Sequence, residues 1–488
     1  MIFDTFIGED GFTISSYEKF FQTSNLITSF KNSFIVSSLV ASFATFFGVI
    51  LGIILGKTEI YFKKFFISIL VIPLLIPPYI LAFGWFQLLG RDGFLGELLF
   101  GFWGVSFVLF SIYLPIPILL TIFFLSQVNP SLEDAGRLVT SWRGVLKNIT
   151  IPLISPAIIL SFMLVFILSF GEVSVANFLR YDLISLESFV QFSAFYDFKM
   201  ATVAAMPLVL IAFLILLIEQ FFIKKNIFRF NSYHEIKYIS LNKYQNRTLF
   251  LVSLFAIIIV IMPLSTIFIK SLDLESFLIA LNKASSPLLR TFIYASIGAT
   301  LLMIFGFLNG YIIENRLFKW WRLWDSSIIF LFALPSTVIG ISLILFYNTT
   351  YTNFIYTTPI IIIFGYLVKY IALTTKIIQT KLSQIPHSLS ESAQMVGAKW
   401  YQILYFILIP ISKKILIISW IIGFIFCIRE NTIIMLLYPP GSDTLPIYII
   451  TQMANGKPEI VSALCVIMII ATLFPIMIFG LYNTNVKK

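Results

Sequence analysis

The sequence predicts an all-α protein that crosses a membrane about eleven times. Of its 488 residues, 59% are hydrophobic and 11% are charged, whereas soluble proteins carry about 25% charged residues. Uninterrupted apolar runs such as 65–89 and 248–269 match the ~20 residues that a helix needs to cross a bilayer. Spans of a β-barrel would be about 10 residues of alternating polarity, so the runs indicate helices.

Polar breaks divide the chain into the expected spans. These are residues 33–55, 65–89, 102–125, 154–176, 202–223, 248–269, 291–313, 326–347, 359–375, 415–434 and 459–480. Pro77, Pro78 and Pro335 are expected to kink the spans that contain them. Gly48 and Gly52, like Gly306 and Gly310, are four residues apart on one helix face, which favours close helix packing.

The basic residues predict the orientation. The net charge of +10 would suggest nucleic acid in a soluble chain, but alternate segments between spans hold 22 of the 33 Lys and Arg residues. By the positive-inside rule these segments are cytoplasmic, which places the C-terminus inside and predicts no nucleic-acid partner. The first thirty residues have no long apolar run and no positively charged leader, so we expect no signal peptide.

A comparison of the chain with itself at a shift of 258 residues indicates a tandem duplication. The shift aligns Gly48 with Gly306, Pro77 with Pro335, Glu133 with Glu391, Pro152 with Pro410 and Glu172 with Glu430. Six spans lie within one period, so the two halves cross the membrane in the same sense, as parallel repeats. We expect a first repeat at 1–223 that lacks a first helix, a basic cytoplasmic linker at 224–247 and a second repeat at 248–488.

Composition and motifs exclude most catalytic chemistry. Only two cysteines and two histidines occur, which indicates neither a disulfide framework nor a multi-histidine metal site. The sequence nearest to a phosphate-binding loop is Gly56-Lys57-Thr58, but Leu51 stands where that loop requires Gly. We interpret Lys57 as a cytoplasmic anchor, and we expect no cofactor and no catalytic residue in this chain.

Two cytoplasmic segments, 131–152 and 388–410, each predict an amphipathic helix that stops at a proline. Ser131 with Asp134 and Ser388 with Glu391 fit a capping box, and apolar residues follow at spacings of three and four. On periodicity alone, each would be a helix lying in the membrane interface. Their occurrence twice, on one side and at the repeat shift, favours a pair of docking elements.

These segments resemble the EAA loop of ABC-type importer permeases. The resemblance rests on Glu133-Asp134-Ala135 with Pro152, and on Glu391-Ser392-Ala393 with Gly397 and Pro410; Val139 stands where the first loop should have Gly. It implies the type I importer permease fold in a bacterial inner membrane. It also implies that two copies of a cytosolic ABC ATPase bind these loops and hydrolyse ATP, and that a periplasmic binding protein delivers the cargo.

A second segment is similar to the fused ferric-iron permeases. It comprises Arg429, Glu430, Asn431 and Thr432, then a Pro-Pro-Gly stretch with Pro440 and Gly441; Asn431 and Thr432 replace the usual Leu-Pro. The resemblance implies ferric iron as cargo. Thiamine permeases share the fused architecture, and a secondary transporter driven by an ion gradient is the rival class.

Glu172, Glu430 and Lys369 are ionisable residues within or at the ends of predicted spans. Glu172 and Glu430 each follow a loop proline by 20 residues, so a continuous helix would place them roughly 30 Å away, near the outer mouth. Glu430 could pair with Arg429 or a helix end, or the two carboxylates could guide a hard cation such as Fe³⁺. For Lys369 we expect snorkelling or a carbonyl contact rather than a role in binding cargo.

Overall fold

The computed structural model describes residues 3–8, 11–90, 94–218, 238–241 and 244–485, which form two compact units that divide after Asp273. The first unit begins with η1 (Phe3–Phe6) and a two-stranded ribbon of β1 (Ile7–Gly8) and β2 (Gly11–Phe12). Its helices are α1 (Ser15–Gln22), α2 (Ser24–Lys57), α3 (Lys63–Leu75), α4 (Pro78–Leu89), α5 (Phe94–Leu99), α6 (Phe102–Tyr113), α7 (Pro115–Leu125), α8 (Pro130–Val139), α9 (Trp142–Val145), η2 (Leu146–Thr150), α10 (Ile151–Leu153), α11 (Ser155–Phe170), α12 (Ser174–Phe178), α13 (Ile184–Ser193), α14 (Phe198–Ile218), α16 (Gln245–Ala256), η5 (Ile257–Ile261) and α17 (Met262–Lys270).

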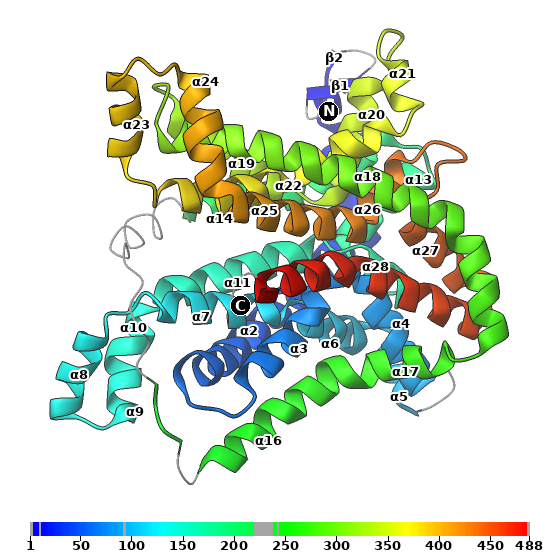
Figure 1. The fold of residues 1–488 in the computed structure, drawn as a ribbon. Helices are drawn as coiled ribbons and strands as arrows, with labels where there is room; N and C mark the ends of the chain where they lie inside the picture. Colours follow the sequence, from blue (N-terminus) through cyan, green and yellow to red (C-terminus); the bar gives the residue numbers. More distant parts are fainter. Residues whose placement is uncertain (1–2, 9–10, 91–93, 219–237, 242–243, 486–488) are drawn as a thin grey trace. The chain divides into compact units, whose positions relative to one another are not determined.

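The second unit is helical throughout its described residues (Figure 1). Its helices are α18 (Leu274–Glu314), α19 (Trp321–Ala333), α20 (Ser336–Tyr347), α21 (Asn353–Tyr356), α22 (Ile360–Leu382), α23 (His387–Met395), α24 (Trp400–Ile403), η6 (Leu404–Leu408), α25 (Ile409–Arg429), α26 (Thr432–Leu437), α27 (Leu445–Asn455) and α28 (Pro458–Asn485). The protein is therefore all-α, as its composition predicts.

The number of membrane spans agrees with the sequence. Among the described residues, 8 helices are long and apolar enough to cross a membrane, and the number rises to 11 when each of three bent helix pairs is one span. The prolines predicted to kink spans cause two of the bends, since α3 meets α4 at 103° and α19 meets α20 at 106°. Pro77 and Pro335 precede the second helix of their pairs, where a proline cannot continue the helix before it.

The predicted stop at the loop proline is wrong in the second loop, whereas in the first loop the helix ends one residue after Pro152. A π-helical turn ends two residues before Pro152, Pro410 and Pro263 alike, in η2, η6 and η5. A proline lacks an N–H and clashes with the carbonyl four residues earlier. A π turn is an insertion in the helix, and it changes the backbone hydrogen-bonding pattern next to the proline. The helix from Trp400 therefore continues through Pro410 to Arg429, whereas the first copy bends by 60° between Leu153 and Ser155.

Each unit is organised around one long helix. In the first unit α2 packs against α7 and α11, and in the second α18 packs against α22 and α25. The predicted glycine contacts are confirmed: a Cβ on Gly48 would lie 2.4 Å from Pro117 Cγ, and one on Gly306 would lie 2.7 Å from Thr374 Oγ1. These close approaches build part of the core of each unit, and in the first unit Phe66 of α3 and Val252 of α16 pack into the same apolar cluster as Leu51 of α2.

The division into units falls later in the chain than the predicted linker because α17 packs against α4. A Cβ on Gly84 would lie 2.5 Å from the carbonyl oxygen of Pro263, and Thr266 Oγ1 donates a hydrogen bond to the Gly84 carbonyl at 3.0 Å. Most of the linker predicted at 224–247 lies outside the described residues. The boundary of the duplication stays a prediction, since packing does not locate it.

Candidate functional site

The first candidate coupling loop is a pair of helices, α8 and α9, joined at Thr140 and Ser141. Pro130 occupies the first turn of α8, and Asn129 caps it by accepting a hydrogen bond from the backbone N–H of Ser131 at 3.0 Å. The predicted capping box at Ser131 and Asp134 is therefore wrong, because a proline preset for the first helical turn moves the helix start two residues earlier. The second predicted box is also wrong: α23 begins at His387, after Pro386, with no side-chain cap.

Neither loop is the single long helix that the periodicity predicts. α8 ends at Val139 because Thr140 adopts an extended conformation (φ −145°, ψ 168°). α23 ends instead through Gly397, whose φ of +81° is in the left-handed region, and the Ala398 N–H donates to the Ala393 carbonyl at 3.0 Å. The first loop thus bends without a glycine, which explains how Val139 occupies that position.

Both loops expose apolar side chains where the first helix ends. Leu138 and Val139 are each 89% exposed in the first loop, and Met395 and Val396 are 88% and 84% exposed in the second. Exposed apolar residues beside charged ones are typical of surfaces that bind another protein. Other EAA positions also lie at the surface, among them Ala135, Ser392, Pro152 and Pro410.

The EAA glutamates differ in their surroundings. Glu133 is fully buried, forms an ion pair with Lys57 at the end of α2, and accepts a hydrogen bond from Thr150 Oγ1 at 2.8 Å. Lys57 is itself 1% exposed, so it is a structural partner of the loop rather than only an anchor. Glu391 is exposed, and no hydrogen bond or ion pair joins its carboxylate to another described residue.

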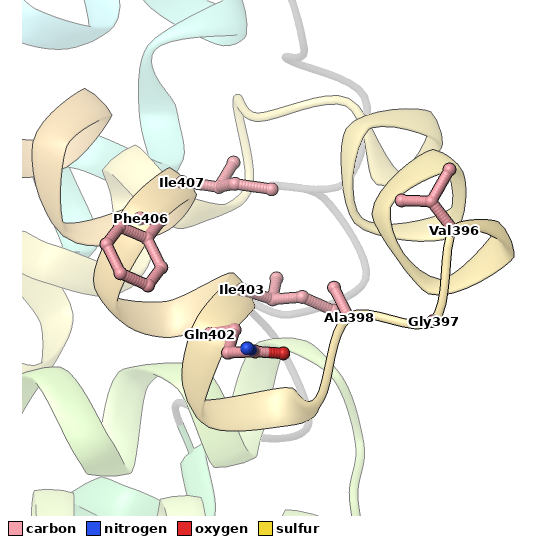
Figure 2. A pocket seen from close by; sticks show the side chains of 7 residues that line it. All are labelled: Val396, Gly397, Ala398, Gln402, Ile403, Phe406 and Ile407. Atoms are coloured by element: carbon pink, nitrogen blue, oxygen red, sulfur yellow. The ribbon is translucent and has the colours of Figure 1, made fainter.

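The second loop contains a pocket of about 380 Å³. Val396 at the end of α23 lines it with Gly397 and Ala398 of the connection, and the following helical residues Gln402, Ile403, Phe406 and Ile407 complete it. Figure 2 shows that the connection through Gly397 and Ala398 holds α23 away from the helix that carries Ile403 and Ile407. In the first loop, the equivalent of Ile407 contacts α8 directly: a Cβ on Gly136 would lie 2.4 Å from Ile149 Cδ1.

The two span-end carboxylates occupy equivalent positions. Glu172 accepts hydrogen bonds from the N–H groups of Ser174 and Val175, at 2.9 and 3.4 Å, and from the Tyr113 hydroxyl at 3.3 Å. Glu430 accepts one from the Ile433 N–H at 3.1 Å and one from the Tyr370 hydroxyl. Each carboxylate therefore caps the short helix that follows it and is held by a tyrosine that periodicity did not single out.

Two residues beside Glu430 belong to the predicted pathway. The guanidinium of Arg429 lies 5.4 Å from the centre of the Phe426 ring. Asn431 is only 5% exposed, and its amide nitrogen makes no hydrogen bond. A buried amide without a partner is costly unless a ligand or water supplies the missing acceptor.

The Pro-Pro-Gly stretch forms a turn that is fixed to α18. Gly441 has a φ of +76°, and the Ser442 N–H donates to the Pro439 carbonyl at 3.0 Å. Arg290 forms an ion pair with Asp443, and Thr291 Oγ1 accepts a hydrogen bond from the Leu445 N–H at 2.8 Å. Pro440 and Gly441 thus lie in a braced connection between α26 and α27.

The buried Lys369 has the role expected for it. Its ammonium donates hydrogen bonds to the carbonyl oxygens of Leu334 and Phe332, the latter at 3.3 Å. These carbonyls lie at the break between α19 and α20, where the last turn of a helix leaves carbonyls without intrahelical partners. The predicted carbonyl contact is confirmed. Within the described part of the chain, no three His, Cys, Asp or Glu side chains gather as metal ligands would.

Comparison with known proteins agrees with this architecture. Residues 303–488 match the model of the binding-protein-dependent transport system inner membrane component. The chain is 24% identical over 452 residues to the ferric transport system permease protein FbpB of Actinobacillus pleuropneumoniae, covering 84% of this chain and 64% of that protein. It is 25% identical over 421 residues to the putative ferric transport system permease protein FbpB 1 of Haemophilus influenzae, covering 78% of this chain and 65% of the relative.

A shorter similarity connects the chain to a different cargo. The molybdenum transport system permease protein ModB of Escherichia coli is 34% identical over 116 residues, which are 22% of this chain and 50% of that protein. The described residues thus hold 8 to 11 candidate membrane spans, and the second half of the chain is similar to a transport permease. Residues 303–488 are similar to the inner-membrane components of binding-protein-dependent transport systems, and the aligned part of the chain spans about 64% of the length of the Actinobacillus pleuropneumoniae relative.

Proposed function

We propose that this chain is the permease of an ATP-driven importer for ferric iron. In this proposal, two copies of a cytosolic ABC ATPase bind the loops at α8–α9 and α23–α24, and a periplasmic protein delivers the cargo on the opposite side. The single observation that carries the proposal is the occurrence of two exposed, apolar-tipped helical loops at the repeat spacing. A permease without a phosphate-binding loop of its own requires ATP hydrolysis by a partner.

The test for the ATPase is co-purification of the tagged chain from its native host in detergent. The variant combines Val139→Asp and Val396→Asp, which place charge on the two exposed tips. We expect an ATP-hydrolysing subunit to co-purify with the wild type and to be reduced at least tenfold with the variant, because desolvating an unpaired carboxylate opposes docking. Tyr351→Asp, at a residue that is 91% exposed outside both loops, is the control.

Two observations support ferric iron as the cargo. The relatives that align over most of this chain are named as ferric transport permeases, and the residues beside α26 have suitable chemistry. We propose that Glu172, Arg429, Glu430, Asn431, Pro440 and Gly441 lie along the cargo pathway. Fe³⁺ prefers oxygen ligands, and Glu172 and Glu430 are carboxylates that the repeat places at the equivalent ends of two spans. Uptake of radiolabelled ferric iron, with molybdate and thiamine as competitors, identifies the cargo, since only a true cargo competes.

The rival class is a secondary transporter driven by an ion gradient. Such proteins carry coupling-ion sites near the midplane, and the buried Lys369 is occupied by backbone carbonyls instead. We expect uptake in proteoliposomes to require ATP and to continue after an ionophore collapses the gradients. Uptake that needs no ATP and stops with the ionophore would contradict the proposal.

A further inference from the structure

We propose that the two coupling loops bind their ATPases through different chemistry, an inference that rests on the function proposed above. The second loop offers an open pocket and a free carboxylate, Glu391, to an aliphatic and a cationic side chain of its ATPase. The first loop satisfies the equivalent carboxylate, Glu133, within this chain and contacts its ATPase through the apolar tip at Leu138 and Val139.

The first loop shows what an EAA glutamate binds when it is buried. Glu133 receives the ammonium of Lys57 on one oxygen and the hydroxyl of Thr150 on the other. A buried carboxylate requires this kind of compensation, because its desolvation is expensive unless a counter-charge and hydrogen bonds replace water. With both oxygens engaged and no exposed surface, Glu133 has no face available for an ATPase side chain.

The second loop lacks each of these internal partners. At the repeat shift of 258 residues, Asn315 stands in place of Lys57 and Leu408 in place of Thr150. The Asn315 amide donates instead to the Tyr311 carbonyl at 3.0 Å, within its own helix. Glu391 therefore keeps its negative charge available at the surface, and a cation from the ATPase is the partner that complements it.

The pocket differs in the same way. In the first loop α8 packs against η2, because Gly136 lets the Ile149 side chain approach the α8 backbone. Gln394 replaces Gly136 in the second loop, and Ile407, the equivalent of Ile149, lines the open pocket of about 380 Å³. The lining side chains are mainly aliphatic and aromatic, but Gln402 and backbone atoms make more than half of the accessible wall polar, so an aliphatic stem of an ATPase side chain fits against the former while a polar group meets the latter.

Matched substitutions separate the two loops. The co-purified ATPase is titrated onto the full-length permease in nanodiscs, at low and at high salt. We expect Glu391→Gln to weaken binding about tenfold at low salt, a typical loss for one charge-assisted contact, and to reduce its salt dependence. Glu133→Gln should leave the affinity within twofold and lower the melting temperature of the permease.

A second variant keeps the test valid if Glu133→Gln alone misfolds the protein at the buried pair. The combination Lys57→Met and Glu133→Gln removes both charges together, so neither remains buried without a partner. We expect its ATPase affinity to equal that of the wild type. The inference is wrong if this variant and Glu391→Gln weaken ATPase binding equally, or if Glu391→Gln changes neither affinity nor salt dependence. A wild-type chain that binds no ATPase would instead overturn the proposed function itself.

Discussion

Thr291 accepts a hydrogen bond from the backbone N–H of Leu445 at 2.8 Å, and Ser33 accepts the equivalent bond from Ile184 at 2.8 Å. Each contact ties the start of a short helix, α27 or α13, to the long helix of its unit. The two hydroxyl residues differ by 258 positions, whereas the two N–H donors differ by 261. The structural equivalence therefore continues past a three-residue insertion at which the constant sequence shift ends.

We expect Thr291→Val to destabilise the protein, because it leaves the buried N–H of Leu445 without an acceptor. An unsatisfied buried donor costs about 1–3 kcal/mol. Thermal unfolding in detergent measures the change. Thr28→Val is the matched control, since Thr28 also donates to a carbonyl four residues earlier, at 2.8 Å, but is exposed and accepts no hydrogen bond from a distant N–H. Equal melting temperatures for the two variants would refute the role of Thr291.

Lys369→Met should weaken the junction of α19 and α20. The substitution keeps most of the apolar stem but removes the donors to the Leu334 and Phe332 carbonyls. We expect a loss of about 1–3 kcal/mol, measured by thermal unfolding. Lys283→Met, at an exposed position of α18, should leave the melting temperature unchanged.

Gly48→Ala and Gly306→Ala should each separate a long helix from its neighbour. The new methyl group would lie 2.4 Å from Pro117 or 2.7 Å from Thr374, and overpacking of this kind costs about 1–3 kcal/mol. Gly480→Ala, also in a helix but with nothing within 4 Å of the added Cβ, should be neutral or slightly stabilising. Melting temperatures in detergent would show the difference, and three equal values would contradict the packing argument.

Gly397→Val should impair ATPase binding although it reproduces the residue of the first loop. Gly397 has a φ of +81°, a conformation that costs a β-branched residue about 1–2 kcal/mol. The second loop should therefore lose its bend, and titration of the ATPase should show weaker binding. Gly397→Asn is the matched control and should bind more tightly than Gly397→Val, because Asn adopts the left-handed region more readily than a β-branched residue and nothing lies within 4 Å of the added Cβ.

The double change Glu172→Gln and Glu430→Gln tests the cargo pathway. Glutamine keeps an oxygen for the capping N–H groups but removes the negative charge that we propose guides Fe³⁺. We expect uptake of radiolabelled ferric iron to fall at least tenfold while the protein still elutes as a single species in size-exclusion chromatography. Undiminished uptake would limit both carboxylates to the capping role seen at Ser174 and Ile433.

The sequence was sufficient for the features that depend on apolar length and on glycine or proline. The spans, the bends at Pro77 and Pro335 and the close packing at Gly48 follow from local rules of helix geometry. The helix ends of the two loops did not follow, because capping by Asn129 and the π turns before Pro152 and Pro410 depend on a choice between neighbouring registers. Periodicity describes which face is apolar and does not locate such an insertion.

The pairs that side chains form with one another were the feature hardest to predict from the sequence. Lys57 and Glu133 are both conspicuous in the sequence, one in a false phosphate motif and one in the EAA pattern, but 76 positions separate them. The tyrosines that hold Glu172 and Glu430 lie in apolar runs with many other aromatic residues. A comparison of the two halves at these positions would have indicated the asymmetry, because Lys57 and Thr150 are replaced by Asn315 and Leu408.

The charge of Lys57 has different surroundings before and after it pairs with Glu133. Lys57 precedes Glu133 by 76 residues, so α2 is synthesised before the carboxylate that pairs with its last residue. In the finished protein the same ammonium is 1% exposed and neutralised. The positive charge that the positive-inside rule counts at Lys57 is thus absent from the surface of the folded protein.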